Sequence, residues 1–138
     1  MSCFADASEL YALIGETLRE LTGDERLMRR FRELDGVLQL RYRRPDAVIS
    51  IDLRRDHPIR IDFGPTALVP DVWLDAEADV AHRYWLGELN LTIALARGQM
   101  RASGPVRKLL RLLPVLRPAL TGYRDRLERA GRADLLAA

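Results

Sequence analysis

The chain has 138 residues, of which 48% are hydrophobic and 30% charged, and its formal net charge is +2 at pH 7. This length predicts one domain and this composition a globular protein, which excludes a disordered or low-complexity chain. No stretch approaches the ~20 apolar residues of a membrane-spanning helix. Asp6 and Glu9 precede the first basic residue, Arg19, so the positive start of a secretory signal is missing, and Cys3 is the only cysteine. We therefore expect a cytoplasmic protein without an internal disulfide.

Two amphipathic helices are predicted at the start of the chain. Asp6 and Glu9 have the three-residue spacing of a capping box, and leucine and isoleucine then recur at helical spacing. Thr22 and Glu25 repeat the capping pattern before a second apolar run. We expect this second helix to end at Gly36 in a left-handed conformation.

A period of two then predicts three antiparallel strands, each with one buried face. The pattern pairs Leu40 with Ile51 across the first turn and Ile51 with Ile61 across the second, with Asp52 opposite Arg60 on the other face. A slip of one residue would expose every apolar side chain, so the register is well specified. The strands cover residues 38–42, 49–53 and 59–63.

The second half of the chain mixes short strands with helices, which indicates an α+β domain. Helix-capping residues, glycines and one proline mark where most of these elements begin and end. In order, the sequence predicts a strand at 72–74, a helix capped by Asp75 that stops near Gly87, a helix at 91–97 capped by Asn90, a strand at 100–103, a helix that begins with Pro105, and a last helix at 120–136.

Three motifs in this half occur in a specific order. They are Tyr-Trp-Leu-Gly at 84–87, Ala-Arg-Gly at 96–98, and a glycine followed by a leucine-rich helix at 104–113. Together they resemble the C-terminal half of the sterol carrier protein type 2 family, in its bacterial and actinobacterial form. The resemblance covers about residues 24–118 of a chain that we expect to be a single domain, residues 1–138. Residues 119–138 would be a C-terminal helical extension.

The resemblance implies a five-stranded, mostly antiparallel sheet covered by helices, with an apolar tunnel between the sheet and the C-terminal helices. In the family such a tunnel holds a sterol, a fatty acid or an acyl chain. Segments 89–96 and 106–113 agree with this, because they carry more apolar side chains than one buried stripe requires, although each residue can equally be ordinary core. By position, the tunnel would be lined by Trp85, Leu86, Leu89, Leu91, Ile93, Leu95, Met100, Leu109, Leu110 and Leu113.

No catalytic motif is present, so we expect a non-covalent binding protein that is not an enzyme and uses no cofactor. His57 in a turn and His82 on a helix face are predicted to be solvated, and neither has a second ligand at zinc-binding spacing. Asp75, Glu77 and Asp79 are predicted to cap a helix and to charge its first turn favourably.

The segment from Arg97 to Arg132 contains ten basic residues and only two acids. It can contact an anionic membrane surface transiently, or it can be a solvated face. No aromatic residues interleave with the arginines, so we expect no nucleic-acid partner. Two rivals to a lipid carrier stay open: a pathway accessory or enzyme that orients a natural-product-like substrate in the same cavity, and an interaction module whose cavity has collapsed. Neither the ligand nor the oligomeric state follows from the sequence.

Overall fold

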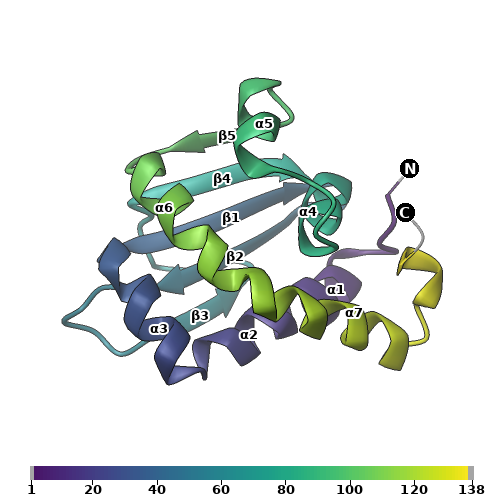
Figure 1. The fold of residues 1–138 in the computed structure, drawn as a ribbon, viewed down its shortest axis with the longest axis horizontal. Helices are drawn as coiled ribbons and strands as arrows, with labels where there is room; N and C mark the ends of the chain where they lie inside the picture. The colour runs from purple at the N-terminus through teal and green to yellow at the C-terminus, as the bar shows by residue number, and fades with distance from the viewer. Residues whose placement is uncertain (1, 137–138) are drawn as a thin grey trace.

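The computed structural model describes residues 2–136, as a layer of helices against a five-stranded sheet (Figure 1). The strand order is β3-β2-β1-β4-β5, in which β1 and β4 are parallel and all other neighbours antiparallel. This α+β architecture confirms the predicted fold class. The strands are β1 Val37–Arg43, β2 Ala47–Asp52, β3 Arg60–Phe63, β4 Val72–Glu77 and β5 Met100–Ser103.

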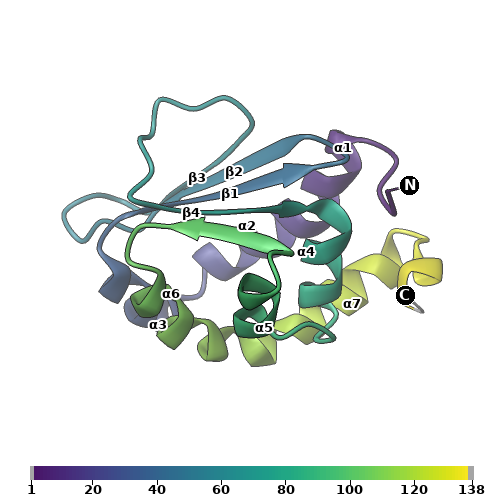
Figure 2. The same cartoon turned by 90° about the horizontal axis from the view of Figure 1, so that it is seen from above.

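Helices α2 to α7 lie on one face of the sheet, and the β3–β4 connection, residues 64–71, arches over the other face (Figure 2). Within residues 2–136, no helix is long and apolar enough to cross a bilayer. The helical elements are α1 Ala7–Leu10, the π-helical turn η1 Tyr11–Gly15, α2 Glu16–Thr22, α3 Glu25–Phe31, the 3₁₀ turn η2 Arg32–Leu34, α4 Ala78–Trp85, α5 Leu91–Ala96, α6 Val106–Leu112, the 3₁₀ segment η3 Leu113–Ala119, α7 Leu120–Arg129 and η4 Ala133–Leu136.

The strand register agrees with the prediction on one side of β2 and differs on the other. Ile51 pairs with Ile61 and Asp52 with Arg60, as predicted. Between β1 and β2, however, Leu40 pairs with Ile49, and Ile51 pairs with Leu38. The predicted register was therefore wrong by two residues. A shift of two leaves every side chain on the same face, so alternation alone does not distinguish the two registers.

The first helix begins as predicted, but the second does not. The Asp6 carboxylate accepts a hydrogen bond from the Glu9 amide at 2.9 Å. At the second helix the cap is Asp24, which accepts from the Leu27 amide at 3.1 Å. Thr22, predicted for that role, is the last residue of α2, and its hydroxyl donates to a carbonyl of its own helix. Both candidates precede the same apolar run, and the backbone turn between α2 and α3 decides between them.

The left-handed residue after this helical segment is Asp35, with φ of 48°, and not Gly36 as predicted. Aspartate is among the few side chains that tolerate this conformation. Its carboxylate accepts a hydrogen bond from the Arg55 amide at 2.9 Å. This contact with the β2–β3 turn explains why an aspartate holds the position, and it is a long-range contact that local sequence does not show.

Strand β4 is three residues longer than predicted. Asp75 lies within it and pairs with Arg43 of β1 at 3.3 Å, so its predicted role as a helix cap was wrong. Glu77 is at the cap position of α4, but its side chain makes no capping hydrogen bond, and Asp79 lies in the first turn. Because β4 is held by β1 and β5 on both sides, sheet pairing overrides the local capping signal.

The elements after α4 follow the sequence more closely. The Asn90 side chain accepts from the Ile93 amide at 3.2 Å and so caps α5 as predicted. Gly87 and Gly98, with φ of 81° and 74°, end α4 and α5 in the left-handed conformation that glycine permits. Pro105 precedes the first turn of α6 instead of lying in it. The last helix ends at Arg129, and the short turn η4 follows it.

His82 is buried, which contradicts the predicted solvated histidine. Only 3% of it is exposed; its Nδ1 atom lies 2.7 Å from the Tyr123 hydroxyl, and its Nε2 atom lies 2.9 Å from the Leu135 carbonyl oxygen. Burial lowers the pKa of His82 below its usual range. Its helix face is covered by the C-terminal segment, which is 41 or more positions away in sequence. His57 is partly exposed in the predicted turn, beside Asp56.

Candidate functional site

An apolar cavity of about 80 Å³ lies between the sheet and the helices. The sheet forms its floor, because inward-facing residues recur at every second position of a strand. The floor consists of Leu38, Leu40 and Tyr42 from β1, Ile51 from β2, Leu74 and Ala76 from β4, Met100 from β5, and Leu53 just beyond β2.

The helices form the opposite wall through residues at helical spacing. Ala81, Tyr84 and Trp85 face the cavity from α4, three and four positions apart. Leu109 and Leu113 lie four positions apart on α6 and at the start of η3. The rest of this wall comes from Leu18, Leu21 and Thr22 of α2, Met28 and Phe31 of α3, Leu91 of α5 and Leu116 of η3.

No aspartate, glutamate, histidine, lysine or arginine of the described chain lines this cavity. Its ionisable groups are the phenols of Tyr42 and Tyr84. Burial raises the pKa of Tyr42 well above its usual range and raises that of Tyr84 to about 12, so both phenols are neutral at pH 7. Among residues 2–136 no three His, Cys, Asp or Glu side chains are grouped to hold a metal ion. The wall therefore suits an uncharged, apolar molecule or molecular segment.

The cavity is small for such a molecule. An engineered apolar cavity of roughly 150 Å³ is known to take up benzene, and ligand pockets generally span about 300–1,000 Å³. At about 80 Å³, the cavity as it stands is too small to hold a long-chain ligand.

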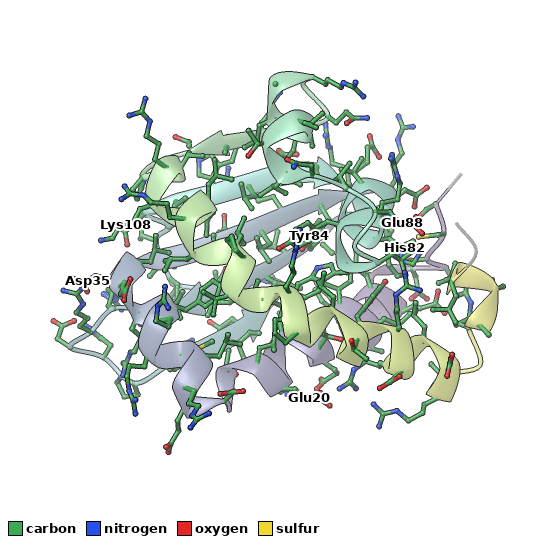
Figure 3. All side chains as sticks on the ribbon, viewed as in Figure 1. Glu20, Asp35, His82, Tyr84, Glu88 and Lys108 are labelled. Carbon is green, nitrogen blue, oxygen red and sulfur yellow. The ribbon has the colours of Figure 1, made fainter. Side chains whose placement is uncertain are left out.

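A second space, which we call the outer recess, lies outside the cavity and has a volume of about 210 Å³. Tyr84, Leu91 and Leu113 line both spaces. They therefore form a partition between the cavity and the recess, and Tyr84 lies where α4 meets η3 (Figure 3). The remaining wall of the outer recess comes from Gly87, Leu89, Asn90, Thr92, Leu110, Pro114, Arg117 and Leu120.

Half of the ten residues that the family resemblance places in the tunnel line the cavity. They are Trp85, Leu91, Met100, Leu109 and Leu113.

The other five lie elsewhere. Leu89 and Leu110 line the outer recess but not the cavity. Leu86 is a buried residue of the core, Leu95 packs partly buried against the core, and Ile93 is 47% exposed.

In the floor the resemblance pointed only to Met100, and it did not point to the wall formed by α2 and α3. The alternation of β1 and β2 did predict that Leu38, Leu40 and Ile51 are buried, but not that they border a void. Met28 also borders an open cleft of about 450 Å³ on the outer side of α3, where acidic and basic side chains mix.

The fold is that of sterol carrier protein 2 domains, as comparison with solved structures shows. The apo sterol carrier protein 2 of Yarrowia lipolytica is 16% identical, with 87% of this chain and 98% of that chain covered and a TM-score of 0.63. A protein of Thermus thermophilus described as possibly a sterol carrier protein is 19% identical, with 87% and 88% covered and a TM-score of 0.60. A structure described as the UbiJ-SCP2 ubiquinone synthesis protein is 18% identical, with 82% and 86% covered and a TM-score of 0.52.

The likeness to these structures is one of fold, at less than 20% identity in each case. No protein-family model matches the chain. No curated protein matches it either.

Proposed function

We propose that this protein binds a hydrophobic lipid non-covalently, holding a fatty acid, an acyl chain or a sterol in the cavity. The observation that carries the proposal is the cavity wall, in which no charged side chain of the described residues takes part. The shared fold with structures described as sterol carrier proteins supports it. The side chains of this wall bind a ligand by burying its apolar surface, and they supply no general acid or base near pH 7. The ligand is therefore released unchanged.

Burial alone supplies enough free energy for useful binding. Each methylene removed from water contributes about 0.8 kcal/mol, so sixteen of them contribute about 13 kcal/mol before the cost of association. A dissociation constant of about 1 μM requires a net ~8 kcal/mol. We therefore expect binding in the micromolar range or tighter, without a charged contact.

The ligand would enter from the outer recess by displacing the partition of Tyr84, Leu91 and Leu113. These three side chains separate the two spaces, and Tyr84 and Leu113 are only partly buried. Inside, we propose that the ligand contacts Trp85, Leu91, Met100, Leu109 and Leu113 together with the floor of the sheet. Leu89 and Leu110 would contact it in the recess.

We also propose that residues 1–138 form one domain that acts in the cytoplasm, with residues 119–138 as an extension whose described part, residues 119–136, belongs to the core. Tyr123 and Leu127 of this extension are 0% exposed, and Leu135 is 8% exposed. The extension packs on α2 and on the turn η1. Its contacts with His82 are part of the same packing.

Native mass spectrometry of the protein as purified from cells, followed by lipid extraction, would test the proposal and identify the ligand. We expect a co-purified lipid near one per chain. A fluorescent fatty-acid analogue should then bind saturably and be competed by unlabelled lipid. Failure to bind fatty acids, sterols and isoprenoid lipids would contradict the carrier function and favour an interaction module with a closed core.

One neighbour favours a second candidate function. The fold is shared with a structure described as a ubiquinone synthesis protein, so the same cavity would orient a long-chain substrate as an accessory of a biosynthetic pathway. The two functions differ in outcome, because a carrier returns its ligand intact. Incubating the lipid-loaded protein in a lysate and following the lipid by mass spectrometry would distinguish them.

A further inference from the structure

The segment from Leu89 to Leu120 contains six basic residues and no acid. All six are exposed, and within residues 2–136 none of them forms an ion pair. Elsewhere the described chain balances many of its charges, with eight arginines in ion pairs. The six residues are Arg97, Arg101, Arg107, Lys108, Arg111 and Arg117.

Four of these cations, Arg107, Lys108, Arg111 and Arg117, lie on α6 and η3, which border the outer recess, and Arg97 directly follows α5. The sixth cation is on β5 beside Met100, which faces the cavity, so it projects from the other face of the sheet and takes no part in this surface. Helices α5 and α6 and the segment η3 are neighbours in the helix layer, and Lys108 lies at its outer edge (Figures 1, 2 and 3). Arg107 and Arg111 are four positions apart on α6, so they project from the same side of the helix. Arg117 is the one charged residue that lines the recess among the residues described.

The same face also exposes apolar side chains. Ile93 on α5 is 47% exposed, one of two large hydrophobic residues with that degree of exposure among the described residues. Leu89, Leu110 and Leu120 line the recess and are only partly buried. Apolar groups surrounded by unpaired arginines match the two layers of an anionic bilayer surface, in which acyl chains lie below phosphate groups.

We infer that the face formed by α5, α6 and η3 docks on an anionic lipid bilayer and presents the outer recess to it. This docking rests on the proposed function, because it gives the lipid a route from the bilayer through the recess to the cavity. A nucleic acid would match the arginines alone and would gain nothing from Ile93 and the leucines. The bilayer accounts for both features.

Flotation of the full chain with phosphatidylcholine vesicles, with and without phosphatidylglycerol, tests the inference. We expect binding to the anionic vesicles only, weakened when NaCl is raised from about 0.05 M to about 0.5 M. The double variant Arg107→Gln/Arg111→Gln should bind about 30-fold more weakly, since each basic residue near an anionic surface contributes roughly a factor of five. The control double variant Arg44→Gln/Arg60→Gln removes the same amount of positive charge from β3 and from the turn that directly follows β1, away from α5, α6 and η3. It should bind the vesicles as tightly as wild type.

A second matched pair tests the apolar contact. Ile93→Ser should lower vesicle binding, whereas Val69→Ser, which alters a 79% exposed valine in the connection that crosses the opposite face, should not. The inference is overturned if either control variant weakens binding as much as its partner. It is also overturned if binding ignores vesicle charge, or if duplex DNA competes for the site and Ile93→Ser has no effect.

Titration with a fluorescent fatty acid in vesicle-free solution separates this inference from the proposed function. Arg107→Gln/Arg111→Gln should bind the fatty acid with wild-type affinity, because neither arginine lines the cavity or the recess. Loss of vesicle binding with retained fatty-acid binding supports docking at this face. A wild-type chain that docks on vesicles but binds no fatty acid or sterol would contradict the carrier function alone.

Discussion

Replacing Ala81 with leucine is expected to fill the cavity without unfolding the protein. Ala81 lies on α4, is 3% exposed and lines the cavity of about 80 Å³, so the added carbons enter a void. A void costs ~24 cal/mol per Å³, so filling all of this one would stabilise the fold by about 2 kcal/mol. We expect the free energy of unfolding to stay level or to rise within that limit. Affinity for a fluorescent fatty acid should fall by about tenfold or more, equivalent to ~1.4 kcal/mol.

The matched control is Ala94→Leu. Ala94 is also a helical alanine, on α5, and is 0% exposed, but it does not line the cavity. Adding carbons there overpacks the core and should cost ~1–3 kcal/mol. Urea unfolding followed by circular dichroism gives both stabilities, and titration gives both affinities. The reasoning fails if Ala81→Leu is as destabilising as Ala94→Leu, or if Ala81→Leu binds the fatty acid as tightly as wild type.

Three further outcomes are expected. Burial lowers the pKa of His82 from the ordinary 6.5, so below that pH the unfolded chain binds more protons than the folded chain. The part of the free energy of unfolding that depends on neutral His82 is therefore present above about pH 6.5 and is lost as the pH falls below it. Melting curves between about pH 7 and pH 5 should show the loss, and His82→Gln should flatten it; an equal slope in the variant would assign the loss to other groups. Leu127→Ala should cost ~2–5 kcal/mol in urea unfolding, because the side chain is fully buried, whereas a cost below about 1 kcal/mol would make the extension peripheral. Leu113→Ala should speed fatty-acid uptake in stopped-flow fluorescence by opening the partition, and an unchanged rate would place the entrance elsewhere.

Features that depend on local sequence were predictable. The cap at Asn90, the glycine that ends α5 and the whole of β5 follow from side chains within a few positions of one another. The pairing of Ile51 with Ile61 was also predicted correctly, because it follows from the alternation of apolar residues in β2 and β3.

Features that depend on distant segments were not predictable. Asp75 looks like a helix cap until β1 lies beside it, and His82 looks solvated until the C-terminal segment covers its face. The cavity could not be predicted from the residue pattern for the same reason. An apolar side chain such as Leu40 is buried whether it meets another side chain or a void, and the sequence pattern is identical in both cases. The family resemblance placed a tunnel between the sheet and the C-terminal helices, whereas only the folded chain shows which side chains of β1, β2 and β4 border the cavity.

Arg132 connects the two ends of the described chain. Its guanidinium group donates to the carbonyl oxygen of Cys3 at 2.9 Å, across 129 positions, and pairs with Glu9 across 123 positions. Phe4, 2% exposed, packs its ring against the edge of His82 in the same region. During synthesis the N-terminal segment leaves the ribosome long before Arg132 does. The contacts between these distant positions therefore form late. Until Arg132 emerges, its contacts with Cys3 and Glu9 cannot form, so the N-terminal segment is fixed in place only after the intervening chain has been synthesised.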